Sequence, residues 1–181
     1  MNAADAIYCG FADIHIATAK LAELPGALAA CRTAADVKRA LANVSAPPTA
    51  GRLQAARSGI DDCFAADSVE EIIRRLQSSD VAEARAALAT MSKASPTSLK
   101  ITLRNVRDAV SFNRLEDSFR QDFRIALAAI AGHDFIEGIR ATIVDKDRNP
   151  KWRPDRLGEV TPDIVDRHFQ SVGELELKFP D

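Results

Sequence analysis

Cationic side chains are concentrated near the C-terminal end of the sequence. Five of the eleven residues from 146 to 156 are basic, namely Lys146, Arg148, Lys151, Arg153 and Arg156. Such side chains bind phosphate groups through charge-assisted hydrogen bonds. The alternative is a solvated turn in which they pair with Asp145, Asp147 and Asp155, and exposed pairs of this kind add little stability. Trp152 lies between the cations, where it either stacks on a base or anchors the loop.

Other patterns that could support chemistry are incomplete. Residues 145–149 have the D-x-D-x-N spacing that opens a calcium-binding EF-hand loop, but Pro150 and Arg156 stand where the loop needs Gly and a carboxylate. The three histidines, His15, His133 and His168, do not have the spacing of a metal motif. No G-x-S-x-G nucleophile elbow and no glycine-rich oxyanion loop is present in the sequence. The residues alone therefore specify no catalytic residue, no metal site and no cofactor.

Length and composition indicate one ordinary globular domain. The chain has 181 residues, of which 46% are hydrophobic and 28% charged. Its net charge of −2 gives no general attraction to nucleic acid or to anionic membranes. The longest apolar run, 125–131, is too short to span a bilayer. No secretory signal is recognisable, and the three cysteines are widely spaced, which favours a reducing cytoplasm over a disulfide framework.

Helices are predicted where apolar residues recur at three- and four-residue spacings. One helix begins near Asp134, whose side chain is expected to cap it. The same helix is expected to carry Lys146 and Arg148 at its C-terminal end and to stop before Pro150. Ser95 is expected to cap a second helix, with Pro96 as its first residue. Pro25-Gly26 is expected to break an earlier helical segment. The longest apolar stripe consists of Phe112, Leu115, Phe119, Phe123, Leu127 and Ile130.

The one convincing candidate strand lies near the N-terminus. Residues 12–16 alternate between apolar and polar side chains, after a short helix that Gly10 ends. A lone strand cannot satisfy its own backbone groups, so it either joins another strand or is irregular. We therefore predict a mainly α fold with one short strand near the N-terminus. We also predict a first region at 1–46, a proline-stiffened linker at 47–51 and a helical region at 52–181.

Four stretches resemble, in family order, the 3-hydroxyisobutyryl-CoA hydrolase branch of the enoyl-CoA hydratase/isomerase (crotonase) superfamily. They are Asn2–Gly10, Asp62–Asp67, Ser95–Arg104 and His133–Trp152, and together they extend over nearly the whole chain. The resemblance implies the helical C-terminal part of a crotonase-like fold. It also implies an acyl-CoA substrate whose thioester is hydrolysed, typically 3-hydroxyisobutyryl-CoA in valine degradation. Coenzyme A enters as part of that substrate, without a separate cofactor.

The same resemblance implies how the substrate is held. Lys146, Arg148 and Lys151 are the expected contacts to the phosphates of coenzyme A. The oxyanion loop and catalytic carboxylates of the family precede the segments that match here, so no catalytic residue carries over. We therefore expect the chain to be inactive alone and the DNA before Met1 to encode the missing half. Expected partners are that N-terminal half or other subunits, including copies of this chain in a homo-oligomer. The alternatives are a non-catalytic helical assembly or binding module, or another member of the enoyl-CoA hydratase/isomerase family.

Overall fold

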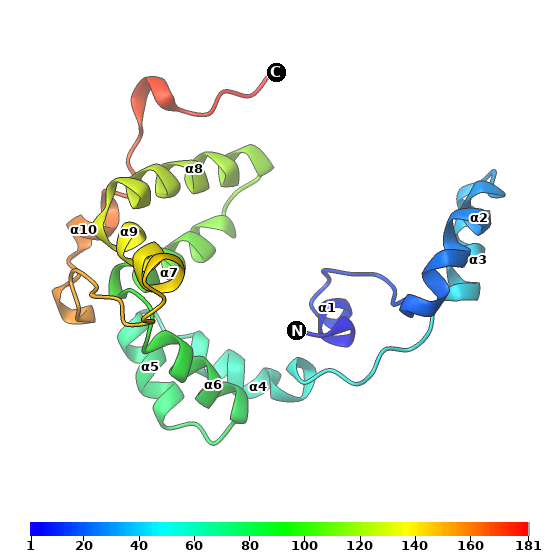
Figure 1. The fold of residues 1–181 in the computed structure, drawn as a ribbon, viewed down its shortest axis with the longest axis horizontal. Coiled ribbons are helices and arrows are strands. Elements are labelled where there is room, and N and C mark those ends of the chain that lie inside the picture. The colour runs from blue at the N-terminus through cyan, green and yellow to red at the C-terminus, as the bar shows by residue number, and fades with distance from the viewer. Residues whose placement is uncertain (181) are drawn as a thin grey trace. The chain divides into compact units, whose positions relative to one another are not determined.

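The computed structural model describes residues 1–180, which are mainly helical, as the sequence predicts (Figure 1). The chain divides into two compact units, the first from Met1 to Asp61 and the second from Asp62 onward. Helix α4 (Leu53–Phe64) contains the division between them. The regions predicted at 1–46, 47–51 and 52–181 follow a different division, and they stay a prediction.

The first unit consists of short helices, two of which begin at a residue whose side chain caps them. Asn2 and Asp5 cap each other's backbone at the start of α1 (Ala3–Tyr8), and Gly10 follows it with a left-handed φ of 76°. Thr33 caps α3 (Ala34–Val44) in the same reciprocal way with Asp36. Between them lie η1 (Thr18–Glu23) and α2 (Leu24–Ala29). The predicted break near Pro25-Gly26 is present but falls slightly earlier, between Glu23 of η1 and Leu24 of α2. Pro25 lies in the first turn of α2, a position at which a helix tolerates proline.

The predicted strand at residues 12–16 is reduced to one antiparallel bridge between Ile16 and Ser45 within the part of the chain described here. The N–H of Ala46 donates to the carbonyl of His15 at 3.0 Å. Pro47 and Pro48 follow at once and have no backbone N–H, so the pairing cannot continue in that direction.

Asp5 fixes the extended segment before α4. Its buried carboxylate accepts the N–H of Leu53 at 2.9 Å, and this bond is the largest cause of its lowered pKa. A Cβ added to Gly51 would collide with the Asp5 side chain, so this position requires glycine. The segment therefore lies against the start of α1 through specific backbone contacts.

The second unit contains the larger cores. Helices α5 (Val69–Gln77) and α6 (Ala82–Met91) enclose Ile72 and Leu76, which pack with Cys63, Ala66 and Ala84. Helix α7 (Pro96–Ala109) contributes Ile101 to a second cluster with Val160 and Val165, the latter from α10 (Pro162–Asp166). Ser95 accepts the N–H of Ser98 and caps α7 as predicted. The short turns η3 (Leu157–Glu159) and η4 (Gly173–Leu175) complete the unit.

Helix α8 (Leu115–Ala131) is the longest helix and contains no fully buried residue. The C-terminal tail lies along its first half. Arg124 pairs with Glu176 at 2.8 Å, and Phe119 stacks on Phe179 with ring centres 6.4 Å apart. Helix α9 (His133–Ile139) follows α8 and continues into the π-helical turn η2 (Arg140–Val144). Lys146 and Arg148 lie beyond this turn with positive φ, so the prediction that the helix carries them at its C-terminal end is wrong.

Candidate functional site

Glu137 lies at the centre of the segment that the sequence singles out. Its side chain projects from α9 and the residue is only 8% exposed. Arg140, one turn later, donates to both of its oxygens, at 2.9 and 2.8 Å. The N–H of Lys151 donates to the same carboxylate at 2.6 Å. The bonds from Arg140, and then the bond from Lys151, lower the pKa of Glu137 to about 2. A single carboxylate thus joins the helix to the far end of the loop.

Arg140 holds the remaining acidic residues of the loop. Its guanidinium donates to Asp145 at 2.6 Å, to Asp147 at 2.7 Å and to the carbonyl of Asn149 at 3.2 Å. The bond from Arg140, and then the bond from the N–H of Asn149, lower the pKa of Asp147. The bonds to Glu137, Asp147 and Asp145 raise the pKa of Arg140 above its usual range. Arginine suits this role because its planar group carries five donors in a fixed geometry.

The backbone of the loop turns sharply after η2. The N–H of Asp145 donates to the carbonyl of Arg140 at 2.8 Å, and the N–H of Arg148 donates to that of Ala141 at 2.9 Å. Lys146 and Arg148 adopt left-handed φ values of 57° and 53°, which residues with a Cβ rarely do. The surrounding hydrogen bonds therefore hold two cationic residues in an uncommon backbone conformation.

All three predicted phosphate ligands are exposed to solvent in this loop. Lys146 and Arg148 form no ion pair within residues 1–180, and the ammonium of Lys151 contacts only the side-chain oxygen of Asn149, at 3.2 Å. The acidic neighbours of Lys146, on both sides, pair with Arg140 instead. Of the acidic residues that could neutralise the cations, Asp145 and Asp147 pair with Arg140, and Asp155 lies 3.8 Å from the guanidinium of Arg156. Whether these cations bind phosphate stays a prediction.

Asp134 does not cap α9, so that prediction is wrong. The N-cap residue is Gly132, which places Asp134 inside the first turn. Its carboxylate instead accepts the Ser95 hydroxyl at 2.5 Å and the N–H of Arg153 at 2.8 Å. The acidic side chain remains near the helix N-terminus, but its partners come from the start of α7 and from the end of the loop. Those contacts are not visible in a sequence.

Trp152 anchors the loop. Its indole N–H donates to the carbonyl of Lys93 at 3.0 Å, and its ring lies 3.5 Å from the position that a Cβ on Gly138 would occupy. His133 bonds to the carbonyl of Lys151 at 2.9 Å, a helix-end structural contact. Of the two interpretations of Trp152, the structure supports the anchor.

A cavity of about 640 Å³ lies beside the loop. Its lining includes Thr97, Ile101, His133, Ile139, Trp152 and His168. The hydroxyl of Thr97 is buried and has no hydrogen-bond partner in residues 1–180. The same hydroxyl has almost no surface that a water molecule could touch, so it offers a ligand no accessible bond.

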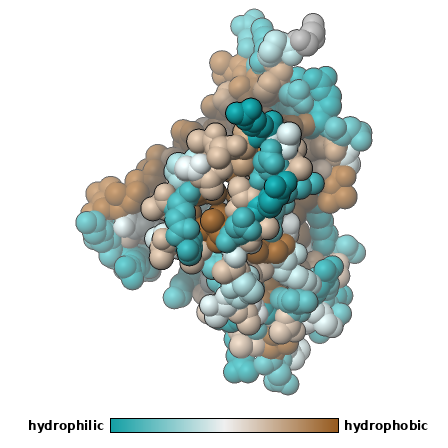
Figure 2. Space-filling model, turned by 90° about the vertical axis from the view of Figure 1, so that its right-hand side faces the viewer, coloured by the Kyte–Doolittle hydropathy of each residue, from teal (hydrophilic) through white to brown (hydrophobic). Residues whose placement is uncertain are grey.

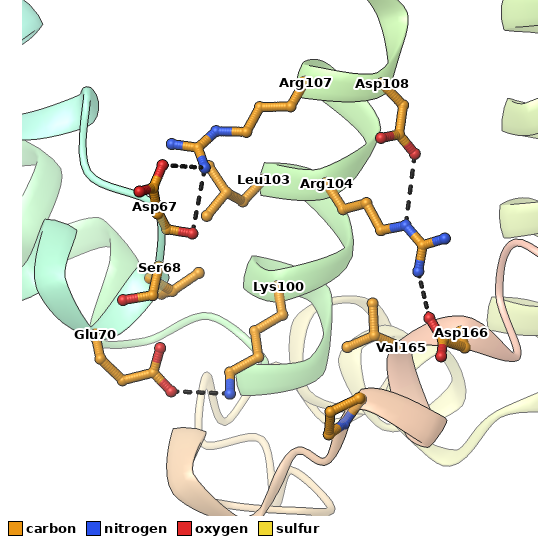
Figure 3. Close-up of a pocket in the computed structure, with 12 residues that line it drawn as sticks. Asp67, Ser68, Glu70, Lys100, Leu103, Arg104, Arg107, Asp108, Val165 and Asp166 are labelled. Atoms are coloured by element: carbon orange, nitrogen blue, oxygen red, sulfur yellow. Dashed lines mark hydrogen bonds and ion pairs between the residues drawn. The ribbon is translucent and has the colours of Figure 1, made fainter.

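A second cavity, of about 400 Å³, lies between α5, α7 and α10 (Figure 3). Three cations of α7 extend into it, and each pairs with an acidic side chain. Lys100 lies 2.8 Å from Glu70, and Arg104 bridges Asp108 and Asp166. Arg107 pairs with Asp67 at 3.5 Å. These ion pairs connect α7 to the start of α5 and to α10. Because the three cations are already paired, this cavity is a weaker candidate for binding an anion than the loop of residues 145–151.

Residues 1–180 contain no group of three or more His, Cys, Asp and Glu side chains that could hold a metal ion. Within the same residues, no helix is long and apolar enough to cross a membrane.

A family profile and curated proteins of known name are similar to this chain. The family profile described as enoyl-CoA hydratase/isomerase matches residues 1–169. The mitochondrial 3-hydroxyisobutyryl-CoA hydrolase of Homo sapiens is 45% identical over 120 residues, which are 66% of this chain and 31% of that protein. The corresponding protein of Danio rerio is 41% identical over 126 residues, 70% of this chain and 33% of its own length.

Two solved structures are similar along almost the whole chain. A carnitinyl-CoA dehydratase from Mycobacterium thermoresistibile is 40% identical with a TM-score of 0.85, covering 97% of this chain and 49% of that one. An enoyl-CoA hydratase from Rhodobacter sphaeroides is 31% identical with a TM-score of 0.81, covering 99% of this chain and 50% of that one. The chain therefore spans about a third of the length of the curated relatives and half of the solved ones.

Proposed function

The chain belongs to the enoyl-CoA hydratase/isomerase family, and from that premise we propose that it forms part of an acyl-CoA thioester hydrolase acting on 3-hydroxyisobutyryl-CoA. The names of the human and zebrafish relatives support this choice of reaction. The two similar solved proteins are named for other reactions, but both names refer to an acyl group attached to coenzyme A. Coenzyme A as part of the substrate is thus the common element, and no separate cofactor is proposed.

The proposed role of this chain is to hold the phosphates of the substrate through Lys146, Arg148 and Lys151. One observation supports it above the others: Arg140 pairs with both acidic residues of the loop and leaves Lys146 and Arg148 exposed. Cations that are already solvated and unpaired form charge-assisted bonds to phosphate without first breaking an ion pair.

Hydrolysis itself is assigned to no residue of this chain. It requires backbone donors aimed at the thioester oxygen and groups that activate water and move protons. The eight glycines of the sequence include no adjacent pair and no G-x-G-x-x-G pattern. We propose that those groups come from another polypeptide segment or subunit, and that this chain alone binds coenzyme A without cleaving thioesters.

Calorimetric titration of the full chain with coenzyme A tests the binding role. We expect binding that weakens as salt is added, because exposed charges are screened. Exchanging Lys146 and Arg148 together for Glu should abolish it, whereas exchanging Lys38 and Arg39 of α3 for Glu is the matched control. Equal affinity of the wild type and the Lys146/Arg148 variant would contradict the proposed role.

Thiol release from 3-hydroxyisobutyryl-CoA tests the second part of the proposal. Losing even one oxyanion donor lowers rates by about 10²–10³-fold, so no release above the uncatalysed rate is expected from this chain. Turnover of about 1 s⁻¹ or faster, within the usual range of enzymes, would show that the chain contains a catalytic site of its own.

A non-catalytic helical module is the second candidate function. The observation that favours it is α8, where Leu115 and Ile130 are 69% and 54% exposed and no residue is fully buried. Such an apolar face is typical of a surface that binds another protein. Absence of coenzyme A binding together with formation of a stable complex with another protein would favour this candidate.

A cytoplasmic location of this chain remains a proposal as well, and the curated relatives are described as mitochondrial.

A further inference from the structure

We propose that Arg140 is a positioning residue for the phosphate-binding loop. It arranges the loop so that cations, and not carboxylates, face an incoming anion, although it does not itself contact phosphate. The inference rests on the function proposed above and adds to it a residue outside the cationic segment. Three features of the structure support this role. They are the number of groups that the Arg140 guanidinium binds, the negative charges that it pairs with in the loop, and the backbone conformation of the residues between those groups.

The first feature is the reach of the Arg140 guanidinium. It donates to Glu137, Asp145 and Asp147 and also to the backbone carbonyl of Asn149, all within 3.2 Å. These groups span thirteen residues of the chain, from α9 to the far side of the turn. A lysine carries its donors on one nitrogen and cannot reproduce this spread.

The second feature is the charge that Arg140 removes from the loop. Asp145 and Asp147 flank Lys146 in the sequence, and Asp147 also precedes Arg148. Without Arg140 these carboxylates become the nearest partners for the cations, and they also repel phosphate. With Arg140 present they are bonded at 2.6 and 2.7 Å and the cations stay unpaired among residues 1–180.

The third feature is the backbone that carries the three cations. Lys146 and Arg148 are held in left-handed conformations between groups that Arg140 binds, namely Asp145, Asp147 and Asn149. Lys151 donates its N–H to Glu137, which Arg140 also binds. Lys146 and Arg148 are therefore next in the sequence to residues that the Arg140 guanidinium binds, and Lys151 is connected to it through Glu137.

The test compares coenzyme A affinity and its salt dependence for Arg140→Lys in the full chain. This exchange keeps the net charge and removes the forked geometry. We expect affinity to fall about tenfold, a loss typical of one charge-assisted hydrogen bond. We also expect a smaller loss of affinity with added salt, because fewer cations reach the phosphates. Arg124→Lys, at an arginine that binds the tail through Glu176, is the matched control and should change neither quantity.

Asp147→Asn gives a second and independent measurement. If only the charge of the loop mattered, removing this negative charge would strengthen binding of coenzyme A. Asp147 uses both oxygens, one toward Arg140 and one toward the N–H of Asn149, and the amide of Asn has only one oxygen. If position matters, the loss of one of these two bonds makes binding weaker or leaves it no tighter. All affinities are measured well below the unfolding midpoint of each variant, so that a change in global stability does not alter them.

The outcomes separate this inference from the proposed function. Wild-type affinity in Arg140→Lys, or tighter binding by Asp147→Asn, overturns the positioning role while loss of binding in the Lys146/Arg148 variant leaves the proposed function intact. If the wild type fails to bind coenzyme A, or if the Lys146/Arg148 variant binds as tightly, the proposed function fails, and the positioning role fails with it.

Discussion

At the scale of single residues, Glu137 has the most unusual environment in the candidate site. It is nearly buried, and it is bonded both to the guanidinium of Arg140 at the start of η2 and to the backbone N–H of Lys151. A carboxylate that receives such bonds is stabilised in its charged form, which is why its pKa lies near 2 instead of its ordinary value of 4.5. That difference makes the stability of the folded chain depend on pH.

Glu137→Gln should therefore destabilise the chain in a pH-dependent way. Because the pKa is lower in the folded state, the charged side chain contributes its full stabilisation above about pH 4.5 and loses it as the pH falls toward about 2. Urea unfolding at several pH values should show a gap between wild type and variant that closes over this range. Glu159→Gln, at an exposed glutamate with no side-chain bond in residues 1–180, is the control and should show no such gap. A gap that stays constant with pH would show that the ionised form is not the one stabilised.

The sequence singled out three cations that lie exposed, but not Arg140, which bonds to the acidic residues beside them. Lys146, Arg148 and Lys151 were recognisable because they are close together in the chain. Arg140 lies outside that cluster, and its partners are three, five, seven and nine residues away. These spacings converge on one side chain only because η2 is a π-helical turn and two following residues are left-handed. Periodicity does not predict either feature. The one available signal was the i,i+3 spacing of Glu137 and Arg140.

At the scale of elements, the outcome of a predicted cap depended on the groups that reach its side chain. Ser95 caps α7 as predicted, because that bond involves only residues within one turn. The cap predicted at Asp134 does not form, because its carboxylate bonds to Ser95 and to the N–H of Arg153, which are distant in the chain. The strand predicted at 12–16 is reduced, within residues 1–180, to the bridge between Ile16 and Ser45.

Helix α5 should contribute more to stability than an exposed part of the second unit. Leu76 of α5 is 1% exposed and packs in the cluster with Ile72 and Ala84. Leu76→Ala should therefore lower the free energy of unfolding by about 2–5 kcal/mol, because buried surface is lost and a cavity is left behind. Leu175→Ala makes the same chemical change in η4 at a residue 67% exposed and should alter it by at most about 0.5 kcal/mol. Urea denaturation measures both. Equal losses for the two variants would show that Leu175 is covered in solution.

At the scale of the whole molecule, apolar side chains remain open to solvent. Hydrophobic residues are visible among polar ones on the molecular surface in Figure 2. On α8, Leu115, Phe119 and Ile130 project from one side, because their positions on the helix differ by about 60° or less. Soluble monomers rarely expose large contiguous apolar patches.

We therefore expect the isolated chain to self-associate and to bind hydrophobic dyes. Leu115→Glu combined with Ile130→Glu should reduce both properties without a large loss of stability, because neither side chain is buried. Val37→Glu on the exposed side of α3 is the matched control. Analytical ultracentrifugation and dye titration make the measurement. A monodisperse monomer that binds no dye would contradict the expectation.

Trp152 is the single tryptophan of the chain, and its indole is bonded to the carbonyl of Lys93 beneath the loop. Fluorescence excited selectively at tryptophan therefore comes from Trp152 alone. A shift of that emission to longer wavelength reports release of the loop from α9, whereas circular dichroism follows the helices as a whole. If the two signals change at different denaturant concentrations, the loop opens as a separate step, and the spectroscopic difference gives its equilibrium constant directly.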